Sequence, residues 1–386
     1  MNNLINHGID GIKFILGLII ASVYKIFEKK DIYIIGERKD QCQDNGYYLF
    51  KYIRENHKDD KVYYCITKNS KQLHKIKPFG NIVYYKSIKH YVLYFISKKL
   101  ICAHVASCTP DTPIIWKLEE KNIINKKRVF IQHGIIKELI PSLMYSSTNF
   151  EAFICGAKPE YEFVKKKFGY RNESVKYLGL CRFDGLHDFK TKKQILIMPT
   201  WRQWFGMNGI NEMSIEDFKE SDYFKKYSSL INNKMLHEIL SYGNLKLIFY
   251  LHHEAQRYIK LFNTTSERVI IANENLYDVQ TLLKESELLI TDYSSIAFDF
   301  AYMRKSIIYY QFDDLKYYEA HYSKGYFDYQ RDGFGKVTKN EEELIKCIEE
   351  VLNNKQNKYL ERIDKFFILN DINNCKRHYE YIINAK

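Results

Sequence analysis

Short apolar runs alternate with segments of helical periodicity along the first half of the chain. Residues 31–36 (DIYIIG) form an apolar run that ends in glycine, and a helical pattern follows over residues 47–55. Further β-rich runs of this kind occupy residues 61–67, 81–85, 100–104, 128–132, 152–155 and 175–178. Strands that alternate with helices predict a parallel sheet that helices cover on both faces.

The same alternation returns after a polar stretch at residues 188–194 (DFKTKKQ). Strand-like runs follow at residues 195–198, 246–251, 268–272, 288–291 and 306–312. A length of 386 residues also suits about two domains. We therefore expect an α/β protein with two Rossmann-like domains, residues 31–188 and 189–386, whose parallel sheets face a central cleft. Ligands of such folds bind beyond the carboxyl ends of the strands.

The amino-terminal residues 1–30 stand apart from this alternation. Residues 14–24 (FILGLIIASVY) are uncharged and lie between Lys13 and Lys25. As a helix they would extend about 16 Å, which is too short for a hydrocarbon core of roughly 30 Å. Lysines rather than a cleavage site follow the run, unlike in a signal peptide. The segment fits an in-plane anchor on an anionic membrane surface, or a first helix packed into the core.

Charge and composition narrow the classes of partner. The chain has 59 Lys and Arg against 47 Asp and Glu, a formal net charge of +12. This balance suits nucleic acid, anionic membranes or phosphorylated substrates. Because no zinc-finger spacing, RNA-binding signature or helix-turn-helix pattern accompanies it, we expect no nucleic-acid partner. The 33 tyrosines have no functional explanation at this level, since coding bias accounts for them equally well.

The eight cysteines form no Cys-x-x-Cys pair and no array with histidine at metal-ligand spacing. This pattern predicts buried thiols. It also favours a reducing compartment, the cytoplasm.

Two serines mark the most informative segment for chemistry, residues 287–313. An apolar strand ends in Thr291 and Asp292, and Ser294 and Ser295 stand where the next helix begins. Serine hydroxyls, the unpaired N–H groups of the first turn and the helix dipole all favour an anion there. The segment is therefore a candidate diphosphate site, although an ordinary serine N-cap explains the same residues.

A histidine follows another predicted strand. His133 comes after residues 129–132 and precedes Gly134, which lets the chain turn sharply and a substrate approach closely. An imidazole at a strand's carboxyl end is suited to proton transfer near neutral pH. The alternative is a structural histidine.

Two further strand ends carry groups that can bind phosphate. Either His252 or His253, after residues 247–251, can contact a phosphate oxygen. No further ligands at metal-binding spacing accompany them. Arg202, in the sequence Pro199-Thr200-Trp201-Arg202, offers a planar donor fork for phosphate, with a salt bridge as the alternative.

Taken together, the motifs resemble a known family. They are IQHG at 131–134, YLGLCRFDGL at 177–186, ILIMPTWR at 195–202, the strand ending at His252, and LITDYSSIAFDF at 289–300. In this order they are similar to those of the CDP-glycerol glycerophosphotransferase family, the teichoic-acid primases and polymerases of bacterial cell walls. The segments at 36–53 and 325–337 are similar to the family's flanking blocks.

The resemblance implies a GT-B fold, with the acceptor in the amino-terminal domain and the CDP-alcohol in the carboxyl-terminal one. It implies that a hydroxyl of a polyprenyl-diphosphate-linked glycan, or of a poly(polyol phosphate), attacks the β-phosphorus of CDP-glycerol and expels CMP. Such a reaction serves teichoic acid or capsular polysaccharide synthesis at the cytoplasmic face of the membrane.

The resemblance also implies roles for individual residues. His133 is the expected base, and His252 the expected contact to the donor phosphate. The residues expected to bind CDP-glycerol are Ser294, Ser295, Arg202, Thr200, Asp292, Arg182 and Asp299. Gly134 and Asn45 are expected on the acceptor side. We expect no cofactor. Because no Asp-x-Asp motif stands at a strand end, we also expect no obligatory metal, although Asp313, Asp314 and Asp299 leave a metal open.

Some alternatives stay open. His252-His253 replaces the family's usual His-Pro, and Lys336 stands where many members carry Pro. These departures leave room for CDP-ribitol as donor, and the same fold also hosts nucleotide-sugar glycosyltransferases. About 30 residues before the first strand favour a primase or a decorating transferase over a polymerase. The sequence also leaves open that the chain forms a homo-oligomer. A further alternative is a catalytically silent scaffold that binds membranes or polyanions.

Overall fold

The computed structural model describes residues 2–206, 211–320, 324–354 and 356–384. The chain forms two compact units. Unit 1 consists of Met1–Ile135, Ile140–Gly185 and Leu369–Lys386, and unit 2 of Ile136–Leu139 and Leu186–Ile368. The main division lies close to the expected boundary at 188/189. The carboxyl-terminal residues, which we expected in the second domain, and the amino-terminal segment, which we set apart, both belong to unit 1.

Unit 1 is built on a seven-stranded parallel sheet of order β3-β2-β1-β4-β5-β6-β7. The strands are β1 (Ile32–Gly36), β2 (Lys61–Ile66), β3 (Ile82–Tyr84), β4 (Lys99–Cys102), β5 (Arg128–Phe130), β6 (Ala152–Cys155) and β7 (Val175–Tyr177). All of β1 is buried, because Tyr33 and Ile35 face one apolar cluster while Ile32 and Ile34 face another. Helices therefore cover both faces, as the sequence predicts.

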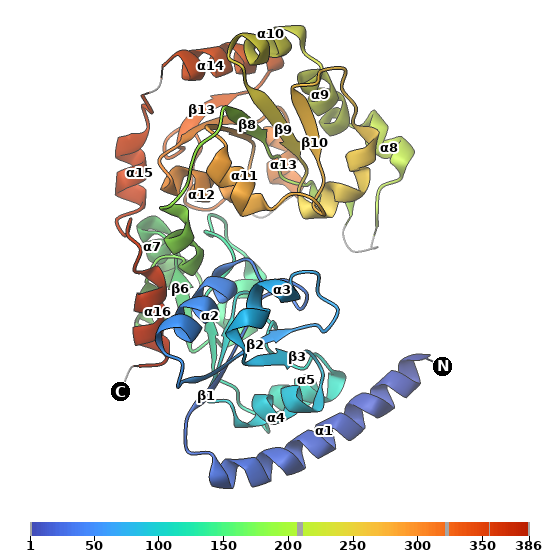
Figure 1. Ribbon diagram of the computed structural model, residues 1–386, viewed down its shortest axis with the longest axis vertical. Helices are drawn as coiled ribbons and strands as arrows, with labels where there is room; N and C mark the ends of the chain where they lie inside the picture. The colour runs from blue at the N-terminus through green and yellow to red at the C-terminus, as the bar shows by residue number, and fades with distance from the viewer. Residues whose placement is uncertain (1, 207–210, 321–323, 355, 385–386) are drawn as a thin grey trace. The chain divides into compact units, whose positions relative to one another are not determined.

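Two groups of helices cover this sheet (Figure 1). One face carries α2, α3 and α16, and the opposite face carries α1, α4 and α5. The helices of unit 1 are α1 (Asn2–Phe27), α2 (Asn45–Asn56), α3 (Leu73–Ile76), α4 (Ile88–Ile96), α5 (Pro113–Glu120), α6 (Tyr145–Thr148), α7 (Lys158–Lys167) and α16 (Asn374–Ile382). Short 3-10 turns are η1 (Lys77–Phe79), η2 (Pro141–Leu143), η3 (Asn172–Ser174) and η4 (Cys181–Leu186).

Unit 2 repeats this topology with a six-stranded parallel sheet of order β10-β9-β8-β11-β12-β13. The strands are β8 (Gln194–Ile197), β9 (Lys246–Tyr250), β10 (Val269–Ala272), β11 (Leu288–Thr291), β12 (Ser306–Tyr310) and β13 (Gly335–Thr338). The order reverses between β8 and β11, as it does between β1 and β4 in unit 1. Such reversals are where open α/β sheets bind ligands, beyond the strands' carboxyl ends.

The helices of unit 2 also lie on both faces of its sheet. They are α8 (Ile215–Glu220), α9 (Asp222–Ile231), α10 (Lys234–Tyr242), α11 (Val279–Glu285), α12 (Ile296–Tyr302), α13 (Asp314–Ala320), α14 (Glu341–Asn353) and α15 (Leu360–Phe366), with 3-10 turns η5 (Gln203–Phe205) and η6 (His253–Leu261). The prediction of two parallel α/β domains is confirmed.

Every run that the sequence analysis interpreted as a strand contains a strand. β13 was missed because it starts with glycine, includes Lys336 and lacks an apolar run. The predicted run 128–132 ends early, at Phe130, because Gln132 turns into the left-handed region with φ 46°.

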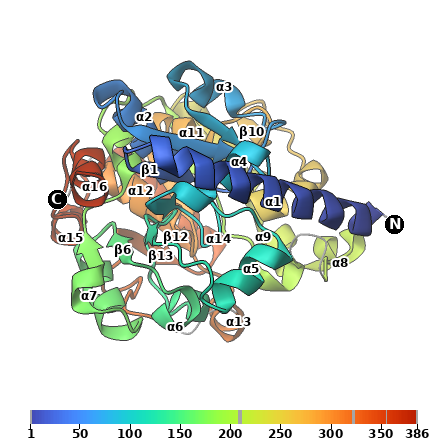
Figure 2. The same ribbon diagram turned by 90° about the horizontal axis from the view of Figure 1, so that it is seen from below.

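Helix α1 is longer than the uncharged stretch and lies along α4, as Figures 1 and 2 both show. Phe14 and Ala21 are buried, and a Cβ atom at Gly17 would come within 2.5 Å of Tyr91 Cβ. One face of α1 thus belongs to the core, as the second interpretation of this segment expects. Within the part of the chain that the structure describes, no helix has both the length and the apolar character needed to cross a membrane.

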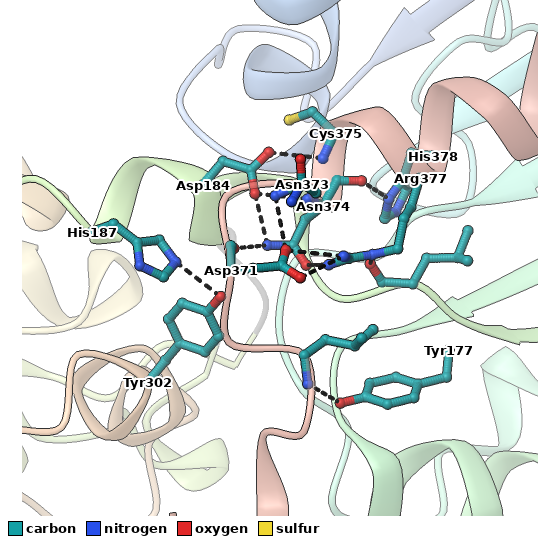
Figure 3. Close-up of polar contacts among 12 residues, drawn as sticks. Tyr177, Asp184, His187, Tyr302, Asp371, Asn373, Asn374, Cys375, Arg377 and His378 are labelled. Carbon is teal, nitrogen blue, oxygen red and sulfur yellow. Dashed lines mark hydrogen bonds and ion pairs between the residues drawn. The ribbon is translucent and has the colours of Figure 1, made fainter. Parts of the chain in front are cut away.

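The carboxyl-terminal helix α16 is held by the Asp184 carboxylate of the YLGLCRFDGL motif. Asp184 accepts hydrogen bonds from the backbone N–H of Asn374 at 2.9 Å and of Cys375 at 2.8 Å (Figure 3). These are first-turn N–H groups of α16, which have no partner within the helix. Gly179, with φ 82°, leaves room for Asn374, whose Oδ1 would lie 1.8 Å from an added Cβ atom. The motif therefore joins the carboxyl-terminal helix to the rest of unit 1.

Candidate functional site

The carboxyl ends of three adjacent strands of unit 1 bring three basic side chains together. Arg38 follows β1, His104 follows β4 and His133 follows β5. The imidazole rings of His104 and His133 are stacked, with centroids 4.4 Å apart and planes 9° apart. Arg38 Nε donates to His104 Nε2 at 3.3 Å. The group lies where the strand order reverses, which is the expected place for a ligand site.

The backbone before His133 turns this side chain outward. Gln132 adopts a left-handed conformation, which is uncommon for a residue other than glycine, and its side chain anchors the turn by donating to Ile154 O at 2.8 Å. His133 is exposed, and its Nδ1 lies 3.4 Å from Ala103 O. A carbonyl oxygen only accepts hydrogen bonds, so Nδ1 carries the proton of the neutral ring. Nε2 then keeps the lone pair that a general base needs.

The pKa of His133 is lowered from its usual range. The largest cause is desolvation by surrounding protein atoms, and the positive charges of Arg182 and Arg38 act in the same direction. Asp44 and the hydrogen bond to Ala103 O oppose them. The imidazole is therefore neutral, and able to accept a proton, at neutral pH.

Asn45 is buried and holds the backbone that precedes His133. Its side chain is fully buried, donates to the carbonyl oxygens of Ile131 at 3.2 Å and Gln132 at 2.8 Å, and accepts from Arg182 N at 3.0 Å. Its amide is used within the protein, which indicates a supporting role. The expectation that Asn45 contacts the acceptor stays a prediction. Gly134 is also buried, directly after His133.

Arg182 lies in unit 1 beside His133. Its Nη1 donates to His133 O and to Asp44 Oδ1, both at 2.7 Å, and only 9% of Arg182 is exposed. These contacts fix the backbone of the loop that carries His133. The expectation that Arg182 contacts CDP-glycerol stays a prediction.

Glu37 occupies the helix terminus at which a Rossmann-like domain would bind phosphate. The buried carboxylate accepts from the backbone N–H of Gln43, Asp44 and Tyr47 at 2.7–2.9 Å. These groups form the amino terminus of α2. Burial, together with the nearby Asp44, raises the pKa of Glu37 to about 7. Because the protein's own carboxyl group takes these donors, unit 1 offers no phosphate cradle at α2.

In unit 2, a buried ion-pair network joins the carboxyl ends of three strands. Arg202 follows β8, Asp292 follows β11 and Asp313 follows β12. Arg202 Nη2 lies 2.8 Å from Asp292 Oδ2, and its Nε lies 2.7 Å from Asp313 Oδ2. Arg202 and Asp292 have no exposed surface. Asp292 also accepts from the backbone N–H of Thr200 at 2.8 Å.

Tyrosine rings enclose the Arg202 guanidinium. The ring centroids of Tyr223, Tyr293 and Tyr317 lie 5.1, 5.2 and 5.5 Å from its Cζ. Arg202 and Asp292 are thus enclosed and paired with each other, which indicates a structural role at the carboxyl edge of the sheet. The expectation that they bind the donor stays a prediction.

Three hydroxyl side chains of unit 2 follow the carboxyl ends of β8 and β11. Ser295 is exposed and Ser294 partly buried at the start of α12. Thr200 Oγ1 is buried without a partner among the described residues. Asp299 is 4% exposed on α12, which places it behind the serines. The expectation that Ser294, Ser295, Thr200 and Asp299 bind CDP-glycerol stays a prediction, and Asp299 is the buried residue of α12 among them.

The two histidines after β9 have different surroundings. His252 Nδ1 accepts from Glu254 N at 3.3 Å, so Nε2 is the N–H donor of the neutral ring. The His252 ring lies 6.4 Å from that of Trp201. His253 Nδ1 contacts the carboxylate of Glu274. His252 is therefore the better candidate for a phosphate contact.

Sequence reasoning missed His104 and Asp44. The available signal for His104 was its place at the end of a predicted strand, like that of His133. Among the described residues, no group of three or more His, Cys, Asp or Glu side chains is arranged to hold a metal ion. The expectation of a metal-free reaction stays a prediction.

Two Rossmann-like units, each with polar side chains at the reversal of its strand order, define a two-domain α/β protein of the GT-B class. Residues 18–384 match the family described as CDP-Glycerol:Poly(glycerophosphate) glycerophosphotransferase. The chain belongs to this family, which confirms the resemblance found in its motifs.

The chain is similar to two curated teichoic acid proteins. It is 34% identical over 381 residues to the minor teichoic acid biosynthesis protein GgaB of Bacillus subtilis (strain 168), covering 96% of this chain and 42% of that protein. It is 29% identical over 218 residues to the teichoic acid poly(glycerol phosphate) polymerase of Bacillus spizizenii, covering 56% and 48%. The chain therefore spans less than half the length of these relatives.

Solved structures share the fold. The wall teichoic acid polymerase TagF aligns with a TM-score of 0.64 at 17% identity, covering 97% of this chain and 96% of that one. The UDP-GlcNAc 2-epimerase from Neisseria meningitidis aligns with a TM-score of 0.52 at 10% identity, covering 92% and 100%. At these identities the likeness concerns the fold alone.

Proposed function

We propose that this chain transfers glycerol phosphate from CDP-glycerol to a hydroxyl of a lipid-linked glycan or polyol phosphate, in teichoic acid or capsular polysaccharide synthesis. The observation that carries the proposal is His133, an exposed imidazole whose Nδ1 holds the proton so that Nε2 keeps its lone pair, within a chain of the glycerophosphotransferase family. A structural histidine would not need the outward turn at Gln132.

The proposed step is one in-line displacement at phosphorus. The acceptor hydroxyl gives its proton to His133 Nε2, and its oxygen forms a bond to the β-phosphorus of CDP-glycerol. The bond from that phosphorus to the bridging oxygen breaks, and CMP leaves with the bonding electron pair. Such transfers depend on positioning and charge stabilisation more than on covalent help from the protein.

We assign the donor to unit 2. Ser294 and Ser295 supply hydroxyls at the start of α12, and His252 supplies the Nε2–H donor after β9. Thr200, next to the β8 end, supplies a third hydroxyl. We assign the acceptor to unit 1, because Glu37 fills the phosphate-binding position there while His133 stays accessible.

A donor screen tests the proposal. We expect CMP release and a mass increase of one glycerol phosphate on a polyprenyl-diphosphate-linked acceptor with CDP-glycerol. With CDP-ribitol, UDP-sugars or CMP-sugars we expect turnover at least about tenfold lower, since a mismatched polar contact costs about 1–3 kcal/mol. Faster turnover with CDP-ribitol would show that ribitol phosphate, and not glycerol phosphate, is the group transferred. Sugar transfer from a nucleotide sugar would refute phosphotransfer altogether.

We also propose that α1 places the chain on an anionic membrane surface. Opposite its contact with α4, the helix exposes a row of apolar side chains: Ile12, Ile15, Leu16, Ile19, Ile20, Val23 and Ile26. Lys25, Lys29 and Lys30 at its carboxyl end are exposed as well. An apolar strip beside lysines suits the interface of anionic lipids. A lipid-linked acceptor would also be found there.

Introducing two negative charges on this apolar strip is expected to weaken the binding of the chain to membranes. Ile12 and Ile19 are 61% and 57% exposed and point away from α4, so Ile12→Glu with Ile19→Glu leaves the buried side of α1 intact. Losing about 1.5 kcal/mol or more per inserted side chain predicts at least roughly a hundredfold weaker binding. Flotation with phosphatidylglycerol vesicles measures this.

The matched control is Ile123→Glu with Leu276→Glu, two exposed positions outside α1. This control should bind vesicles like the unaltered chain. Equal binding by the α1 variant would reject α1 as the contact and leave the basic surface as the explanation. Removing residues 1–30 is a poorer test, because it would uncover the α4 face that Phe14 and Ala21 cover.

A further inference from the structure

The loop after β4 touches His133 in two ways. Ala103 O faces His133 Nδ1 at 3.4 Å, and the ring of the next residue, His104, is stacked on the His133 ring. The loop itself is fixed: Ala103 N donates to Gly36 O at 3.0 Å, and Ser107 Oγ donates to His104 O at 2.8 Å. One short loop therefore sets both the tautomer and the ring plane of His133.

Arg38 determines the state of His104. Its Nε–H donates to His104 Nε2, so that nitrogen must hold a lone pair. An imidazolium ion has no lone pair, and the contact therefore excludes the charged form of His104. The remaining proton is on Nδ1, which is buried and lacks a hydrogen-bond partner among the described residues. Desolvation, His133 and Arg38 together lower the pKa of His104 well below its usual range.

We propose that His104, held by Arg38, is a positioning residue that keeps His133 oriented and available as an unprotonated base. His104 does so as a flat, neutral wall: it covers one face of the His133 ring against water and stops the ring from rotating. The role rests on the proposed function, in which His133 takes the acceptor's proton. It adds a residue that no motif of the sequence singled out.

Other charged groups near His133 also shift its pKa. Asp44, at the start of α2, raises the pKa of His133, whereas Arg182 on η4 and Arg38 after β1 lower it. Asp44 and Arg182 hold each other at 2.7 Å, independently of His104. Removing the stacked ring admits water to the His133 ring, which favours the imidazolium ion.

The experiment follows the protonation of His133 directly in the full-length chain. Histidine labelled with ¹⁵N gives the pKa and the tautomer from the Nδ1 and Nε2 resonances, and steady-state kinetics with CDP-glycerol give kcat and KM. For His104→Ala we expect the pKa of His133 to rise by about half a unit or more. We expect a loss of the single tautomer and about three- to tenfold lower kcat at unchanged KM for CDP-glycerol.

Three further variants make the test specific. His104→Phe keeps a stacked ring, so the pKa of His133 should shift by no more than about a third of the shift in His104→Ala. Arg38→Gln changes an exposed residue, so folding should survive, and loss of its charge should raise the pKa of His133. His57→Ala removes another stacked histidine of unit 1, which packs on Tyr379 at 3.7 Å, and should change neither quantity.

An unchanged pKa and tautomer of His133 in His104→Ala would overturn the proposal. The same holds if His104→Phe shifts the pKa as far as His104→Ala, or if His57→Ala produces the same change. The resonances do not depend on turnover. If they shift as expected while His133→Ala stays active, the positioning contact holds and the proposed function fails.

Discussion

Replacing His133 with alanine is expected to lower CMP release from CDP-glycerol by about 10²–10⁴-fold, the usual contribution of a positioned general base. The variant removes Nε2, the nitrogen that would accept the acceptor's proton. It should leave unit 1 folded, because His133 is exposed and its loop is held through backbone contacts to Asn45 and Arg182. The measurement is CMP release with a polyprenyl-diphosphate-linked acceptor.

The pH dependence provides a second view of the same residue. The base acts in its neutral form, so the rate should fall as the pH drops through the pKa of His133. Because that pKa is lowered, the half-maximal rate on the acid side should lie below about pH 6.5, the ordinary histidine value. His74→Ala, an exposed histidine on α3, is the control and should retain full activity. Unchanged turnover in His133→Ala would end the base assignment.

The fold was predictable because its signal is local. Strands buried on both faces read as short apolar runs, and each such run in this chain, from 31–36 to 306–312, contains a strand. The element that was missed, β13, pairs with β12 at the edge of its sheet and is too short and polar to stand out. The return of α16 to unit 1 had no local signal, because it depends on Asp184, which lies 190 residues earlier in the chain.

The site was only partly predictable, because burial is a tertiary property. The motifs located His133, His252 and the two serines at strand ends. They could not show that the side chains of Asn45 and Arg202 are buried. The residue type in a motif is the same whether the side chain contacts a ligand or supports a neighbouring residue that does. His104 was missed for the complementary reason: it belonged to no motif, and only the order of the sheet brings β4 beside β5.

The abundance of tyrosine also gained a partial physical explanation. Tyr293 stacks on Tyr317, with centroids 3.7 Å apart, and both rings line the Arg202 network. A buried guanidinium gains from aromatic faces that exclude water while offering favourable electrostatics. Phenylalanine would provide the faces but not the hydroxyl of Tyr293, which donates to Asp313 Oδ1 at 3.3 Å. Some of the tyrosines are therefore structural parts of unit 2.

The Arg202 network is expected to be the most sensitive point for the stability of unit 2. Arg202→Met keeps the length of the side chain but leaves Asp292 and Asp313 without their cation, and Asp292 is fully buried. Breaking a buried pair in this way costs about 3–5 kcal/mol of the free energy of unfolding. For a unit of this size the midpoint should fall by about 6–20 °C. Thermal unfolding is followed by tryptophan fluorescence, since Trp201 and Trp204 lie in unit 2.

Two variants separate this structural role from a direct role in binding the donor. Arg304→Met breaks an exposed ion pair with Asp364 in the same unit and should cost about 0–1 kcal/mol. Arg202→Met combined with Asp313→Asn should recover more than about 1 kcal/mol of the single variant's loss, because one unpaired carboxylate has gone. If Arg202 instead contacts the diphosphate, Arg202→Met would weaken CDP-glycerol binding while ligand-free unfolding stayed unchanged. Only the enclosed network predicts a large loss of stability before any donor is added.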